Sequence, residues 1–153
     1  MPANTQPIYT VTPNVGSIII GTTSAQVKSD GTSAGTGTDL MYKAFTAGAN
    51  GSFIEKIRFS CVASAAATTS VATTLRAYLS TVASPGATAN TDTFLIGEVS
   101  ASAQSASHST NATNYYEIPV NLAIPTGYYI HVSQHVAQTT NQSWLATVFG
   151  GDY

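Results

Sequence analysis

Alternation of apolar and polar residues with a period of two is the feature that most limits what this chain can fold into. Between Phe53 and Val62, polar residues occupy every second position at Lys56, Arg58 and Ser60. The apolar side of the alternation consists of Phe53, Ile57, Phe59 and Cys61. Successive side chains of a β-strand point to opposite faces, so this pattern predicts a strand with one face toward a core and the other toward water.

The same alternation recurs in Ser70–Thr81 and Tyr128–Val136. Further segments are rich in the β-branched and aromatic residues that favour strands: Ser17–Thr22, Leu40–Ala47, Thr93–Ser100, Tyr115–Leu122 and Ser143–Phe149. Turn sequences separate several of them, at Gly48–Gly51, Ser84–Gly86 and Pro125–Gly127. Strong helix formers do not occur in long runs.

These segments predict an all-β fold, namely an antiparallel β-sandwich that is jelly-roll-like and has about eight strands. A length of 153 residues is ordinary for one domain, and we expect a single sandwich domain over residues 17–153. An immunoglobulin-like sandwich is the near alternative, although its Cys…Trp…Cys pattern is missing because Cys61 is the only cysteine.

The first sixteen residues differ from the rest. Pro2, Pro7 and Pro13 disfavour regular strand pairing across this segment, so we expect an extended N-terminal arm over residues 1–16. Ile8, Tyr9 and Val11 give the arm apolar side chains that could be buried against a neighbouring molecule. A frayed terminus is the alternative interpretation.

Charged residues make up only 8% of the chain, and no lysine or arginine follows Arg76. Polar positions are filled instead by 23 threonines and 17 serines. Such a neutral hydroxyl surface suits a chain held in an assembly better than one kept apart from others by charge. With no basic stretch and no long apolar run, we expect neither nucleic acid nor membrane as a partner. The first residues resemble no secretory signal, so we expect the chain not to be secreted.

One motif could suggest catalysis. Residues 31–35 read Gly-Thr-Ser-Ala-Gly and match the G-x-S-x-G nucleophile elbow around Ser33. The elbow requires a buried strand before it and a helix after it, whereas this match lies in a Gly/Thr/Ser-rich segment. We interpret it as a chance match and expect no enzyme activity and no catalytic residue.

Metal or cofactor binding is not predicted either. The segment between Asp30 and Asp39 lacks a calcium-loop pattern. His131 and His135 share one face of a predicted strand, about 13 Å apart at ~3.3 Å per residue, which is too far for one metal. We interpret both as exposed strand histidines that could report pH beneath an interface. Glu55, Glu98 and Glu117 fall in separate strands.

Aromatic residues gather in the last forty positions, and adjacent tyrosines on a strand must point to opposite faces. Outward aromatics beside Ser, Thr and Asn are suitable for a protein interface or for stacking on sugars. The candidate interface residues are Ile8, Tyr9, Val11, Tyr129, His131 and Trp144.

Four segments resemble small virion proteins encoded beside capsid genes in tailed bacteriophages. They are Gly51–Phe59, Thr74–Leu79, Ile118–Tyr128 and Ser143–Tyr153, and the similarity covers roughly residues 48–153. The resemblance implies a virion β-sandwich, and specifically a capsid decoration (cement) protein that stabilises the head by bridging major capsid subunits. It carries over no active-site residue.

The resemblance therefore implies a location on the outer capsid surface after synthesis in the host cytoplasm, and the major capsid protein of a phage head as partner. It implies a homo-oligomer, with a trimer expected first and a dimer second. The alternative function is a receptor-binding or tail-tip module that recognises host glycans.

Overall fold

The computed structural model describes residues 10–21, 41–64, 68–83, 92–107, 109 and 114–153. These residues form ten strands and no helix: β1 Thr12–Ile20, β2 Tyr42–Thr46, β3 Ser52–Ala63, β4 Thr68–Thr69, β5 Thr73–Ser80, β6 Thr93–Ala101, β7 Ser105–Ala106, β8 Tyr115–Ile124, β9 Tyr129–Gln134 and β10 Gln142–Asp152.

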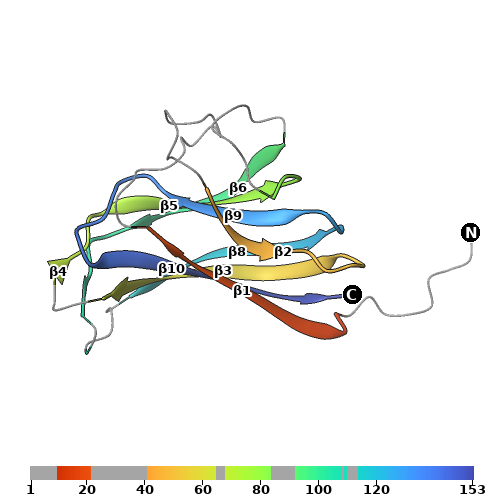
Figure 1. Ribbon diagram of the computed structural model, residues 1–153, viewed down its shortest axis with the longest axis horizontal. Helices are drawn as coiled ribbons and strands as arrows, with labels where there is room; N and C mark the ends of the chain where they lie inside the picture. Colours follow the sequence, from red (N-terminus) through yellow and green to blue (C-terminus); the bar gives the residue numbers. More distant parts are fainter. Residues whose placement is uncertain (1–9, 22–40, 65–67, 84–91, 108, 110–113) are drawn as a thin grey trace, which may run out of the picture.

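Two four-stranded antiparallel sheets lie one over the other (Figure 1). The first sheet has the order β1-β10-β3-β8 and the second has the order β2-β9-β5-β6. The two-residue strands β4 and β7 form a separate small ribbon. The expected all-β antiparallel sandwich is thus confirmed, and the strands of five or more residues correspond to the segments predicted from the sequence.

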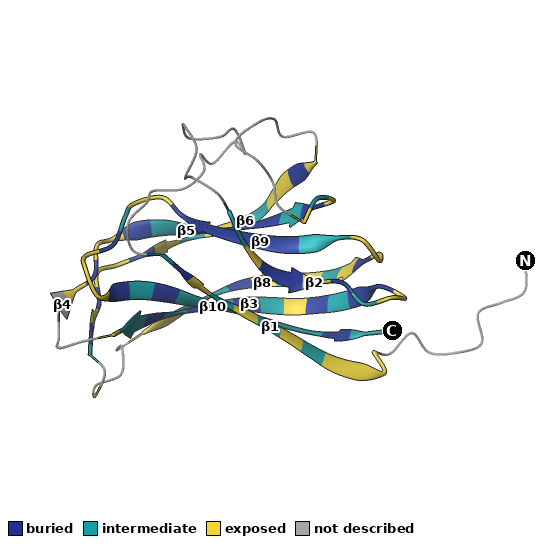
Figure 2. Cartoon of the chain, viewed as in Figure 1, coloured by how far each residue is buried: buried dark blue, intermediate teal, exposed yellow. Residues whose placement is uncertain are grey.

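The core lies between the two sheets and follows the period-two pattern (Figure 2). Ile57, Phe59 and Cys61 of β3 are buried, as the alternation predicts, and Trp144 and Val148 of β10 lie beside them. Each large apolar side chain buried in this way contributes about 1.5–3 kcal/mol to folding. The alternating burial of β3 and β10 residues therefore packs the first sheet against the core.

One position of the β3 prediction is wrong. Phe53 was expected in the core, but it is only partly buried, and its neighbour Ile54 is fully buried. The pairing of β3 with β10 shifts register between Ile54 and Lys56, so Glu55 is an extra residue in β3. A β-bulge of this kind reverses which face each later residue occupies.

Strand β1 begins earlier than expected. Pairing with β10 starts at Thr12, so the boundary expected after residue 16 falls inside β1. Pro13 lies opposite Gly151 in this pairing, although we expected proline to prevent it. Because β1 is an edge strand, a residue without an N–H can be accommodated there. Residues 1–9 of the expected arm lie outside the described residues.

The two sheets approach closely where β1 lies against β2. A Cβ atom at Gly16 would overlap the carbonyl oxygen of Ala44, so only glycine allows this separation. Since the Cβ direction of a strand residue is roughly perpendicular to its sheet, β2 lies over the inner face of β1. The inner face of β1 is therefore covered by β2, and the opposite face of this edge strand remains exposed.

Candidate interaction surface

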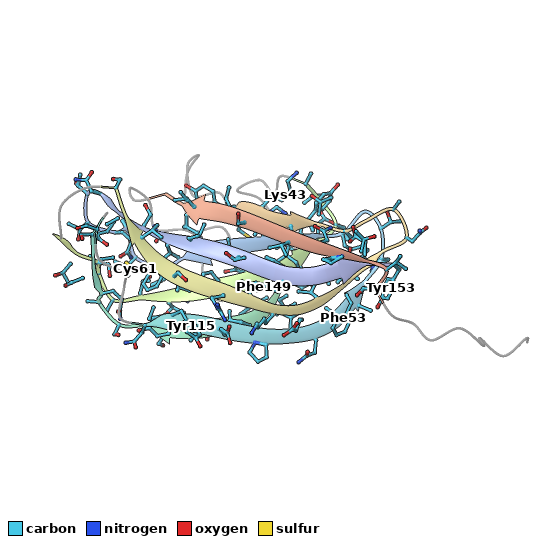
Figure 3. All side chains as sticks on the ribbon, turned by 90° about the horizontal axis from the view of Figure 1, so that it is seen from below. Lys43, Phe53, Cys61, Tyr115, Phe149 and Tyr153 are labelled. Atoms are coloured by element: carbon cyan, nitrogen blue, oxygen red, sulfur yellow. The ribbon has the colours of Figure 1, made fainter. Side chains whose placement is uncertain are left out.

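The outward-facing side of the first sheet is the candidate interaction surface. Residues paired across neighbouring strands point to the same face, so the strand registers define three rows of four side chains. We call these twelve residues the outer face: Val15, Phe149, Lys56 and Pro119; Ser17, Thr147, Arg58 and Glu117; Ile19, Leu145, Ser60 and Tyr115. All twelve are exposed or half-buried. Figure 3 views the molecule from this side, with Phe149 and Tyr115 labelled.

The β1 and β10 half of the outer face is uncharged. Val15 and Ile19 are 57% and 56% exposed, which is unusual for two β-branched apolar residues on one strand. Leu145 and Phe149 of β10 lie beside them and are half-buried. The only polar groups of this half are the hydroxyls of Ser17 and Thr147. Covering a surface of this composition with another protein costs little desolvation free energy, because few polar groups lose their hydrogen bonds to water.

The β3 and β8 half carries a small ion-pair cluster. Glu117 accepts hydrogen bonds from Arg58 and lies 3.2 Å from the Lys56 ammonium. The hydrogen bonds from Arg58, more than those from Lys56, lower the pKa of Glu117 below its ordinary value. Glu117 is therefore ionised at neutral pH. Two cations share this one carboxylate, so the face keeps one uncompensated positive charge.

Aromatic rings hold the two cations in place. The Arg58 guanidinium lies 4.4 Å from the centroid of the Tyr115 ring and 5.5 Å from that of Phe149. The Lys56 ammonium lies 5.7 Å from the Phe149 ring centroid. Contacts of this kind contribute about 0.5–1 kcal/mol each at exposed sites. Phe149 thus joins the uncharged half of the outer face to the charged half.

The residues proposed from sequence are not brought together. Ile8 and Tyr9 lie outside the described residues. Val11 is 82% exposed and donates its N–H to the Asp152 carbonyl. Tyr129 is half-buried on the second sheet, with the Lys43 ammonium 5.4 Å from its ring centroid. Val11 therefore precedes the first sheet at β1, whereas Tyr129 lies in the second sheet.

Two of the proposed contact residues are buried instead, and we correct both expectations. Trp144 is fully buried because its register with Cys61 and Ile20 directs it into the core, where its ring packs edge-to-face on Tyr116 with centroids 5.7 Å apart. His131 is also fully buried. Neither side chain can contact a partner from its position in this structure.

The histidine interpretation changes accordingly. The His131 Nε2 atom lies 3.1 Å from the Val82 carbonyl oxygen, and burial lowers the pKa of the ring below its ordinary value. His131 is therefore neutral at pH 7. His135 is exposed, as expected, but it follows the end of β9 at Gln134 instead of sharing a strand face with His131, and its Nδ1 lies 3.3 Å from Arg76 Nη1.

Among the described residues, no group of three or more His, Cys, Asp or Glu side chains could hold a metal ion. Cys61 is a buried free thiol whose pKa burial raises, so it is not a reactive cysteine. Ser33, Asp30 and Asp39 lie outside the described part of the chain.

Sequence reasoning missed the most exposed members of the outer face, Val15 and Ile19. The run Ile18–Ile20 is uniformly apolar, so it contains no signal for which side faces water. Gly16 and Ser17, which precede this run, gave only a weak indication of which residues of the strand face outward. Tyr115, by contrast, is 58% exposed while Tyr116 packs inward, in agreement with the rule that adjacent tyrosines face opposite ways.

Comparisons with protein-family models, with curated proteins and with solved structures give no match to this chain. The described residues contain no helix of the length and apolar character needed to cross a membrane.

Proposed function

We propose that this chain is a structural virion protein of a tailed phage, which binds the outside of an assembled capsid and bridges major capsid subunits. The observation that carries the proposal is the uncharged half of the outer face, where Val15, Ile19, Leu145 and Phe149 surround two hydroxyls. Exposed apolar surface of this kind is a common mark of a protein interface.

The order of the long strands supports the same proposal. Numbered without β4 and β7, the strands follow the orders 1-8-3-6 and 2-7-4-5 in the two sheets. This connectivity favours a jelly roll, an architecture frequent in viral capsid proteins. The argument from architecture is one of analogy, since one fold can serve many functions.

A virion role is also consistent with the sparse charge. Lys56 and Arg58 both pair with Glu117, so the outer face keeps only one net positive charge, and we expect contact with the capsid to depend mainly on apolar area and hydroxyl groups. Exposed ion pairs are screened over ~10 Å at 0.1 M salt, whereas apolar contacts are not. We therefore expect capsid binding to persist at raised salt.

The test is to mix the purified protein with undecorated, expanded heads of its own phage. Occupancy and the temperature of DNA release are then measured at low and high salt. A ligand that binds only the native lattice stabilises it by about 2.7 kcal/mol per site at a hundredfold excess over Kd, so decorated heads should release DNA at a higher temperature. Loss of binding at modest salt would contradict the proposed interface chemistry.

A matched pair of variants locates the contact. Leu145→Lys introduces a charge in the uncharged half, beside Ile19, on the interior strand β10. Ser100→Lys introduces the same charge at an exposed position of β6 in the other sheet. We expect Leu145→Lys to weaken head binding at least tenfold and Ser100→Lys to leave it unchanged, with thermal unfolding as the check on folding. Equal binding by both would contradict docking through the outer face.

The alternative function is a receptor-binding or tail-tip module that holds host glycans, for which Tyr115 stacked on Arg58 offers an aromatic platform. Binding to tail structures or to host cells, with none to heads, would favour this alternative.

A further inference from the structure

Among the described residues the sandwich has four edge strands, and three of them are interrupted by a bulge. The two sheets end at β1, β8, β2 and β6. The pairing of β2 shifts at Ala44, the pairing of β6 shifts at Ile96, and the pairing of β8 shifts between Pro119 and Leu122. Bulges and prolines at edges prevent sheets from pairing with other molecules. Three edges are therefore protected against addition of a further strand.

The fourth edge, β1, contains no bulge. Its nine residues pair with β10 without a register shift. The strand contains no charged residue, and Pro13 lies near its beginning. Among the described residues, β10 is its only hydrogen-bonded neighbour, because β2 lies over its inner face instead of beside it. No strand of the described part of the chain pairs with the outward row of backbone N–H and C=O groups of β1.

We propose that β1 pairs antiparallel with β1 of a second copy of this chain across a two-fold axis at Ser17. Residues on the outer face must pair with residues on the same face. Centring on Ser17 satisfies this requirement and places Val15 of one copy opposite Ile19 of the other. In this register Pro13 lies outside the pairs that surround the two-fold axis.

The chemistry of β1 favours a second copy as the occupant. An isologous contact requires a self-complementary strand, and an uncharged strand with apolar residues on both sides of a serine meets this condition. Val15 with Ile19 forms an apolar cross-strand pair, and the two Ser17 hydroxyls meet at the axis. The resulting eight-stranded sheet would join the uncharged halves of two outer faces into one surface.

This inference does not depend on the proposed capsid role, because dimer formation is a property of the isolated protein in solution. It corresponds to the dimer, the second of the two oligomers implied by the resemblance.

Cysteine cross-linking tests both the dimer and its register. Opposite residues in antiparallel strands have Cα atoms about 4.5–5.5 Å apart, within the range that a disulfide spans. Under mild oxidation, Ser17→Cys should give a disulfide-linked dimer that reduction reverses. Two Val15→Cys residues would be about 13 Å apart in this register and should not link. Ser100→Cys, on the bulged strand β6, is the control for random collision, and the native Cys61 is buried.

The mass of the unmodified protein, measured by sedimentation equilibrium, should be that of a dimer at micromolar concentration. Ser17→Lys places two ammonium groups opposite each other at the axis and should raise the dimer dissociation constant at least tenfold, whereas Ser100→Lys should not. A monomeric mass throughout the concentration range, or equal cross-linking of Ser17→Cys and Ser100→Cys, would overturn the proposal. Linkage of Val15→Cys without linkage of Ser17→Cys would overturn the register.

Discussion

The Asp152 carboxylate accepts two hydrogen bonds from the side-chain amide of Asn14, at 2.9 and 3.0 Å, and so joins the end of β10 to the beginning of β1. The Ser52 hydroxyl of β3 also donates to Asp152. One carboxylate near the C-terminus therefore holds three strands of the first sheet together at one end.

The first prediction concerns acid stability. Hydrogen bonds from Ser52, then from Asn14, lower the pKa of Asp152 in the folded state. The stabilisation is therefore complete above the unfolded pKa, near ~3.9, and is lost as pH falls through the lower folded pKa. Asp152→Asn should lower the free energy of unfolding by about 1 kcal/mol at pH 7.

Urea unfolding followed at pH 7 and at pH 2 measures this effect, with Asp92→Asn as the control at an exposed position before β6. The difference between the Asp152→Asn variant and the native chain should shrink at pH 2. An equal difference at both pH values would contradict the assigned role of the carboxylate.

The second prediction concerns Gly48, which lies against the same carboxylate. A Cβ at Gly48 would come 2.5 Å from the Asp152 Cγ, so the carboxylate must move away from Ser52 and Asn14. Gly48→Ala should therefore destabilise the fold by about 1–3 kcal/mol. In the Asp152→Ala background, which removes the clash, the same substitution should cost clearly less. Additive effects of the two changes would show that Gly48 acts through something other than Asp152.

The third prediction uses Trp144, the only tryptophan in the chain. Because the ring is fully buried, its fluorescence should be blue-shifted in the native protein and should shift to the red on unfolding. Trp144→Ala should cost about 3–5 kcal/mol, whereas Trp144→Phe should cost less because it keeps the contact with Tyr116. A native emission spectrum typical of exposed tryptophan would contradict the burial of this residue.

The fourth prediction concerns limited proteolysis. Lys56 and Arg58 lie in β3, and Arg76 lies in β5, both of which are interior strands of their sheets. Backbone in such strands becomes accessible to a protease only on large-scale unfolding. Native protein should therefore resist trypsin at these three residues, and denatured protein should yield residues 77–153 as one peptide. Rapid native cleavage at Lys56 would contradict the placement of β3.

A fifth prediction addresses the N-terminal segment. Because β1 begins at Thr12, removal of residues 2–9 leaves all pairs between β1 and β10 intact. The truncated protein should keep its melting temperature, while its binding to heads or to a second copy should weaken if Ile8 and Tyr9 dock on a neighbour. Unchanged binding would mean that the segment has no docking role.

The sequence alone determined the strand content and much of the core. In β3, the alternation predicted the burial of Ile57, Phe59 and Cys61 correctly, because a regular strand has a period of two and a sandwich buries one side of it. The same reasoning was wrong at Phe53, because the bulge at Glu55 depends on how β3 pairs with β10.

Only the tertiary structure decided which polar and aromatic residues are buried and where the outer face lies. His131 and Trp144 belong to alternating strands in which either side could face water, and the packing of the two sheets directs both inward. Val15 and Ile19 are apolar yet exposed, because β1 is an edge strand and its other side already packs against β2. Local sequence records the period of a strand, but the neighbours that cover each face are set by contacts between residues distant in the chain.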